Sequence, residues 1–244
     1  MSKLTQEDFH YIKADLRHGR ISPGTIRYGL GAFMVFSAFM VGIAYTVATA
    51  NNTVIGWENL SSFWQTVFKI EAILFIVQLI LVIFVKGRKN WSQILLNVSY
   101  VLYTYKMVLD PFVMISMFSM DRGEYEIYRL IILFIIIFGF TLQFYMIRRL
   151  FQKLQDGKIE NKQKQKEKKR RGYLLYITPF FFILASITGY IISNELLGDM
   201  DLLLILGVVM LVFIGVLIGT IEFVIGAYCV IRFPSFRVNP PKEK

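Results

Sequence analysis

Cysteine and histidine are nearly absent from this chain, and their scarcity excludes several kinds of chemistry. The 244 residues include one cysteine, Cys229, and two histidines, His10 and His18. A single cysteine cannot form an intramolecular disulfide. Zinc sites generally need clustered cysteine, histidine or carboxylate ligands. We therefore expect neither a bound metal nor another cofactor.

Sequence motifs of enzymes are also missing. The chain has no G-x-S-x-G nucleophile elbow, no H-E-x-x-H metal site and no P-loop. No cysteine or serine is paired with a histidine in a way that would activate a nucleophile inside a membrane. The acidic pairs Asp121/Glu124 and Asp199/Asp201 lie in short predicted loops, with too few oxygen ligands for calcium or magnesium. The sequence therefore predicts a protein that is not an enzyme.

Long hydrophilic stretches are scarce, so the chain has no room for a soluble domain. The longest one, 148–172, is too short to bury a core of its own. Six apolar runs fill most of the rest, and each reaches the length of about 20 residues that a helix needs to cross a bilayer. These runs are 28–50, 66–85, 92–118, 127–147, 173–192 and 202–231. The predicted fold class is all-α, a polytopic membrane protein with six transmembrane helices in one domain.

The basic residues are distributed unevenly between the loops, and this distribution predicts the orientation. With a cytoplasmic N-terminus, 23 of the 27 lysines and arginines fall on the cytoplasmic side. They lie in the segments 1–27, 86–91, 148–172 and 232–244. Because cytoplasmic loops carry an excess of lysine and arginine, both termini are expected in the cytoplasm. The net charge of +10 then favours contacts with anionic lipid headgroups, and we expect no nucleic-acid partner.

Residues 5–18 predict a short amphipathic helix ahead of the first span. Phe9, Ile12 and Leu16 lie on one stripe of that helix. The Ser-Pro-Gly sequence at 22–24 is expected to break it before the span begins. The apolar stripe would rest in the cytoplasmic membrane interface or dock on the protein's own loops, and the sequence leaves both readings open.

The third span contains the first group of candidate site residues. Ser99, Tyr103, Lys106 and Asp110 recur at helical spacing and share one face. Lys106 and Asp110 are four residues apart and can pair along the helix. Charges at this depth are costly, so this face should line the bundle or a wet cavity. Pro111, next in the chain, is expected to kink the helix.

The last span carries a second candidate, Glu222, beside a stripe of small residues that predicts close helix packing. The glycines of that stripe are Gly207, Gly215, Gly219 and Gly226. Glu71, in the second span, is predicted near the outer boundary. The functional reading is a polar pathway or pocket lined by Lys106, Asp110 and Glu222, joined by Glu71. In the competing reading these residues serve packing alone. Since Glu222 falls in the inner half, we expect no direct pair with Lys106.

Two classes of function fit these observations. The first is a non-enzymatic component of a membrane assembly, with an accessory, scaffold or protective (immunity-type) role. Its expected partners are anionic lipid, another membrane or cytoplasmic protein, or a second copy of the chain. The alternative is a small permease or channel-forming subunit, because the number of spans and the chain length resemble those of ABC-type exporter membrane subunits, although no motif is shared. A composition rich in phenylalanine, isoleucine and lysine is typical of bacteria with AT-rich genomes.

Overall fold

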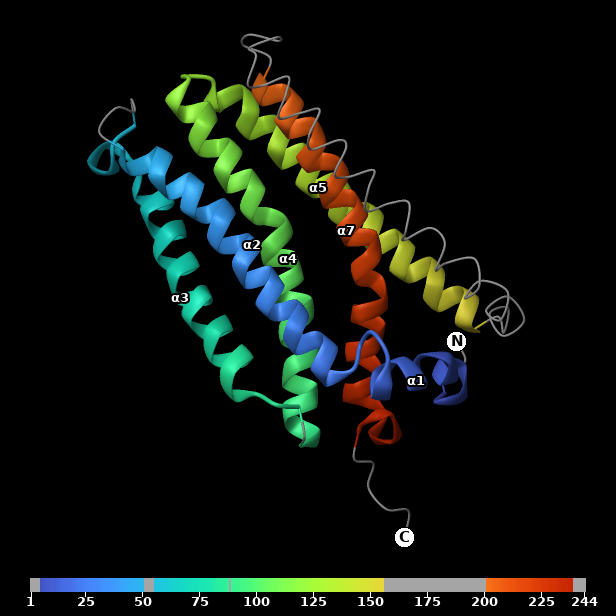
Figure 1. Cartoon of the computed structure of the whole chain (residues 1–244). Helices are drawn as coiled ribbons and strands as arrows, with labels where there is room; N and C mark the ends of the chain where they lie inside the picture. The colour runs from blue at the N-terminus through green and yellow to red at the C-terminus, as the bar shows by residue number, and fades with distance from the viewer. Residues whose placement is uncertain (1–4, 51–54, 88, 156–200, 239–244) are drawn as a thin grey trace.

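The computed structural model describes residues 5–50, 55–87, 89–155 and 201–238, and within these ranges the chain forms helices and no strand. Five helices are long and apolar enough to cross a membrane. They are α2 (Pro23–Thr49), α3 (Ser62–Phe84), α4 (Asn90–Asp121), α5 (Tyr125–Gln155) and α7 (Asp201–Arg232) (Figure 1). The all-helical prediction is thereby confirmed for the described residues, and the five apolar helices are consistent with a multi-pass membrane protein. The predicted span 173–192 and most of the basic loop before it lie outside the described residues.

Short helices flank these five. A 3-10 turn, η1 (Glu7–Phe9), leads into α1 (His10–His18), and two further turns are η2 (Trp57–Asn59) and η4 (Pro234–Phe236). The helical conformation is interrupted between Gly19 and Ser22, and the backbone N–H of Ser22 donates a hydrogen bond to the Gly19 carbonyl there. The break expected at 22–24 is therefore misplaced, because Pro23 and Gly24 begin α2. A proline is well suited to the first helical position, where its missing N–H is not needed.

The turn between α4 and α5 shows why a glycine is required there. Gly123 has a positive φ of 75°, which an L side chain rarely adopts. Its N–H donates to the Met120 carbonyl, and the N–H of Glu124 donates to the Ser119 carbonyl. This pair of bonds is the Schellman pattern that closes a helix C-terminus. The turn reverses the chain within a few residues, so α5 starts beside the end of α4 (Figure 1).

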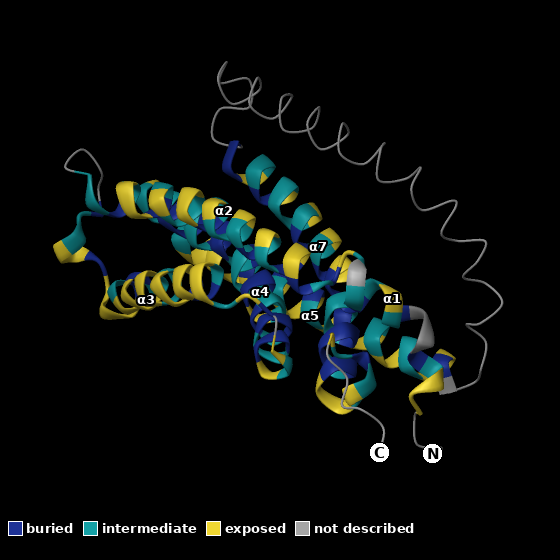
Figure 2. Cartoon of the chain, turned by 60° about the horizontal axis from the view of Figure 1, so that its bottom comes forward, coloured by how far each residue is buried: buried dark blue, intermediate teal, exposed yellow. Residues whose placement is uncertain are grey.

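Helix α4 is the central element of the bundle. Half of the residues in its most apolar 18-residue segment are buried, whereas the buried fraction of the corresponding segment is 17–22% in the other four long helices. It packs mainly on α2 and α7, while α3 packs on α2 and α5 packs on α7. Figure 2 shows the consequence, a largely exposed α3 at one edge and a more deeply buried α4. Any polar residue on the buried faces of α4 therefore meets other helices and not lipid.

The described ends of the helices fall into two groups (Figure 1). The α2–α3 and α4–α5 connections lie at one end, together with the start of α7. Helix α1, the α3–α4 connection and the ends of α5 and α7 lie at the other. The described segments with most of the basic residues thus share one end of the molecule.

Helix α1 lies against the bundle at that same end. Phe9, Ile12 and Leu16 are buried in one apolar cluster with residues of α5, α7 and η4. The Phe9 ring lies 5.8 Å from that of Tyr228 and 6.3 Å from that of Phe151, measured between centroids. The apolar stripe therefore docks on the protein itself, and the reading in which it rests on the membrane is not the one that the structure adopts.

Candidate functional site

Three charged residues of α3 and α4 form one cluster inside the bundle. The Lys106 ammonium lies 2.5 Å from the Glu71 carboxylate of α3. It also donates to both carboxylate oxygens of Asp110, at 3.1 and 3.0 Å. The side chains of Lys106, Glu71 and Asp110 are only 11, 13 and 1% exposed. We call these three residues the charged triad.

The triad lies far from the ends of its helices. Lys106 is near the middle of α4, about 23 Å from either end at 1.5 Å per residue. Glu71 lies at the same depth in the bundle, because its carboxylate contacts the Lys106 ammonium. The sequence placed Glu71 near the outer boundary, but α3 begins at Ser62 and so carries this residue further into the bundle. The expected pair between Lys106 and Asp110 is present, and Glu71 adds a second anion.

Two hydroxyl groups adjoin the charged triad. Tyr103 donates from its phenol to the Leu74 carbonyl of α3 at 2.9 Å, which fastens α4 to α3 beside Glu71. Ser37 of α2 is 2% exposed and its hydroxyl lies beside the Asp110 carboxyl. That hydroxyl makes no hydrogen bond of standard geometry with any described group. Ser99, which the sequence placed on the same face, is also buried in α4.

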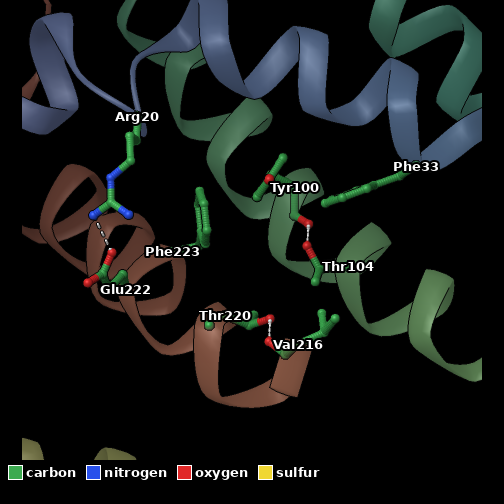
Figure 3. A pocket seen from close by; sticks show the side chains of 9 residues that line it. Arg20, Phe33, Tyr100, Thr104, Val216, Thr220, Glu222 and Phe223 are labelled. Carbon is green, nitrogen blue, oxygen red and sulfur yellow. Dashed lines mark hydrogen bonds and ion pairs between the residues drawn. The ribbon is translucent and has the colours of Figure 1, made fainter. Parts of the chain in front are cut away.

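Glu222 belongs to a different site. Its carboxylate accepts a hydrogen bond from the Arg20 guanidinium at 2.7 Å, on the segment that joins α1 to α2. The pair lies on a groove of about 240 Å³ between α2, α4 and α7, drawn in Figure 3. The expectation that Glu222 does not pair with Lys106 fits this geometry. The structure thus divides the four predicted charged residues into a triad and a separate groove residue.

Aromatic rings form one wall of the groove (Figure 3). Tyr100 of α4 lies between Phe33 and Phe223, with centroid distances of 4.9 and 4.5 Å. Thr104 and Thr220 also line it, and each hydroxyl donates to a carbonyl one turn back in its own helix. Tyr100 packs so closely on Gly29 that a Cβ there would lie 2.6 Å from the ring. The groove therefore combines a charged end with an apolar, aromatic body.

The glycines of α7 do not behave alike. A Cβ at Gly226 would touch Ile21 and Leu16, so this glycine lies in a helix contact, beneath α1. A Cβ at Gly207, Gly215 or Gly219 would meet no described atom within 4 Å. Packing at those three positions stays a prediction. The closest described approach of α7 to another long helix at a glycine is at Gly139 of α5, where a Cβ would overlap the Phe213 ring.

Sequence reasoning missed several polar contacts that join the helices. Gln78 of α3 donates to the Leu30 carbonyl of α2 at 2.8 Å, and Gln143 of α5 donates to the Leu217 carbonyl of α7 at 3.0 Å. Both side chains are buried. Their position in the sequence could have indicated these contacts, because an isolated amide side chain within an apolar span needs a hydrogen-bond partner when it is buried. Ser37 and Arg20 carried no such signal, since neither residue type is unusual at its position.

The arrangement limits what the described residues can do chemically. No group of three histidine, cysteine, aspartate or glutamate side chains among them is placed to hold a metal ion. The charged triad can fix helices and hold a proton, while the groove offers a charge pair and an aromatic surface. Comparison with protein-family models, with curated proteins and with solved structures finds no match to this chain.

Proposed function

We propose that the protein is a non-enzymatic, multi-pass component of a bacterial cell membrane, with six spans and both termini in the cytoplasm. Its role is that of an accessory, scaffold or protective (immunity-type) subunit, which binds another protein or a second copy and contacts anionic lipid. The carrying observation is a set of four polar side chains inside the bundle that each bond a group of a neighbouring helix: Lys106, Tyr103, Gln78 and Gln143.

The charged triad is the main instance of this use. Lys106 binds Glu71 across the α3–α4 contact and Asp110 along α4. Tyr103 adds a second α4–α3 bond, while Gln78 and Gln143 tie α3 to α2 and α5 to α7. A polar pathway for a solute would need such groups to face a wet channel. Here they are engaged with neighbouring helices, which favours a fixed bundle.

The proposed orientation is supported by where the helix ends lie. Helix α1, the α3–α4 connection and the C-terminal ends of α5 and α7 share one end of the bundle (Figure 1). These segments carry most of the described basic residues. A cytoplasmic location for that end satisfies the positive-inside rule and brings the exposed Arg148 and Arg149 close to anionic headgroups.

The alternative is a small permease or channel-forming subunit, and the groove is the observation that favours it. Charged groups on transmembrane helices that face a cavity mark substrate routes in transporters. Arg20 and Glu222 lie at one end of the groove, and Tyr100 lies within it (Figure 3). A solute with a charged group and an apolar body would match this lining.

Purification from the native membrane separates the two proposals. The tagged chain, extracted in mild detergent, is expected to elute in a stoichiometric complex with a protein that hydrolyses no ATP, or as a homo-oligomer. A stoichiometric ATP-hydrolysing subunit would contradict the accessory role and support the permease. The chain with Val216→Phe, which narrows the groove, is the matched variant, and Val212→Phe, at a position of α7 outside the groove lining, is its control. The accessory role predicts that both variants retain the complex and its cellular phenotype.

A further inference from the structure

The charged triad has an unequal number of positive and negative groups. Glu71 and Asp110 each carry one negative charge when ionised, and Lys106 carries one positive charge. The three side chains are 13, 1 and 11% exposed and lie near the middle of a membrane-spanning helix. With both carboxyls ionised, the cluster would hold one uncompensated negative charge, which a low-dielectric interior strongly disfavours.

We propose that the charged triad binds one proton, held by the Asp110 carboxyl, so that Asp110, Glu71 and Lys106 are together electrically neutral. The step is proton uptake from the aqueous phase, in which –COO⁻ and H⁺ give –COOH and no other bond forms or breaks. Glu71 and Lys106 are then the ion pair, and Asp110 is a neutral acid that still accepts a hydrogen bond from Lys106.

Two features of the geometry select Asp110 over Glu71. Asp110 is the more deeply buried carboxyl, so its ionised form is the more costly one. Lys106 lies closer to Glu71, at 2.5 Å, than to either oxygen of Asp110, which favours charge on Glu71.

Ser37 offers a partner for that proton, and its own O–H can equally donate to an ionised Asp110. A carboxylate has acceptor oxygens only, whereas a protonated carboxyl has an O–H to donate. The Ser37 oxygen has lone pairs that no described donor uses. A proton on Asp110 could be donated to the Ser37 oxygen after a small adjustment of the two side chains. Among the described residues, Tyr103 is a further titratable group in the immediate surroundings, beside Glu71.

The proton site does not depend on the accessory role proposed above, because charge balance applies equally to a scaffold and a permease. Infrared spectroscopy of the protein in lipid vesicles at neutral pH tests it directly, since a protonated carboxyl has a C=O band distinct from that of a carboxylate. We expect one protonated carboxyl from the triad in the unmodified chain. Labelling with ¹³C-aspartate should shift this band, and labelling with ¹³C-glutamate should leave it unchanged.

Infrared spectra of triad variants then test how many protonated carboxyls the triad contains. Asp110→Asn should abolish the band. Glu71→Gln should also abolish it, because Lys106 then neutralises an ionised Asp110. Lys106→Met should give two protonated carboxyls, one from aspartate and one from glutamate. Asp201→Asn is the matched control, since Asp201 is another aspartate that is buried in the described structure, at 8% exposure, and its removal should leave the band in place.

Several outcomes would overturn the proposal. An unmodified chain with no protonated aspartate would mean that the triad carries its net charge. A band that responds to the glutamate label would place the proton on Glu71. A band lost in Asp201→Asn would assign it elsewhere. The labelled unmodified chain and the Asp201 control suffice for these decisions even if the triad variants fail to fold.

Discussion

The Lys106 ammonium of α4 is 2.5 Å from the Glu71 carboxylate of α3, closer than it is to Asp110 on its own helix. The interhelical contact therefore holds two helices at one depth, while the intrahelical contact does not. A single cation shared by two acids also makes the three residues unequal in their expected effects on stability.

Removal of Lys106 should destabilise the protein more than removal of either acid. Lys106→Met leaves two buried carboxyls without a cation, and breaking a buried pair in this way costs about 3–5 kcal/mol. Glu71→Gln and Asp110→Asn each leave one neutral pair, so we expect a loss of about 1.5 kcal/mol, the size of a charged hydrogen bond. Thermal unfolding in detergent measures the order.

Lys69→Met is the control for these variants, because Lys69 is an exposed lysine on α3 and its loss should change the stability by no more than about 0.5 kcal/mol. Adding Glu71→Gln and Asp110→Asn to Lys106→Met should recover part of the loss, since no unpaired carboxyl is then left. Equal and additive losses for all three residues would mean that the charges are not coupled.

Much of the bundle could be predicted from the sequence, and the triad shows where prediction stopped. Helical spacing placed Lys106 and Asp110 on one face because that relationship is local. The partner on α3 is a non-local relationship, which depends on how deeply each helix is inserted. The apolar run begins at residue 66 but α3 begins at Ser62, so the sequence predicts Glu71 a few residues too close to the outer boundary. Arg20 was missed for a related reason, since its contact with Glu222 requires the chain to return across the bundle.

Helix ends were the least predictable part of the fold. Apolar runs mark where a helix crosses the membrane, but capping and backbone hydrogen bonding decide where it ends. Thus α2 begins at Pro23, whereas the apolar run begins only at residue 28. The docking of α1 was undecided because an amphipathic stripe fits a membrane surface and a protein surface equally well.

Gly139 is expected to tolerate no side chain. A Cβ at this position would overlap the Phe213 ring of α7, so Gly139→Ala should lower stability by about 1–3 kcal/mol through overpacking. Gly42→Ala is the matched change, at an α2 glycine whose Cβ would meet no described atom within 4 Å, and should be neutral or stabilising, since alanine favours a helix over glycine by about 1 kcal/mol. Chemical or thermal unfolding of both variants makes the comparison. Equal stability for the two would contradict the close α5–α7 contact.

The pair Gly215 and Gly219 should matter for packing in a different way. Neither meets a described atom of the same chain at its Cβ position, so a helix contact at these glycines involves residues beyond the described helices. Replacement of both by leucine is expected to lower the melting temperature in detergent or to break an oligomer, as for other small-residue seams. Size-exclusion chromatography with light scattering reports the second effect. An unchanged melting temperature and mass would mean that both glycines face lipid.

The orientation is testable by reporter fusions. If 23 of the 27 basic residues lie inside, successive fusions should report out, in, out, in, out and in. The fusion points are Asn52, Lys89, Arg122, Lys164, Asp199 and Lys244. An extracellular signal at Lys164 would overturn the six-span arrangement, because it would place the most basic segment on the wrong side.

Phe9 should be the residue that holds α1 on the bundle. Its ring is fully buried among Phe151, Tyr228 and Phe233, and loss of a buried phenylalanine costs about 3–5 kcal/mol. Phe9→Ala should therefore release α1, while the membrane-spanning helices stay folded because their own contacts are untouched. Amide hydrogen exchange would show fast exchange confined to residues 10–18. Gln6→Ala, an exposed change one turn earlier, is the control and should leave exchange as it is. If protection of α1 in detergent survived Phe9→Ala, the aromatic contact would not be what anchors it. If protection instead required added anionic lipid in the unmodified chain, the membrane interface and not the bundle would hold the helix.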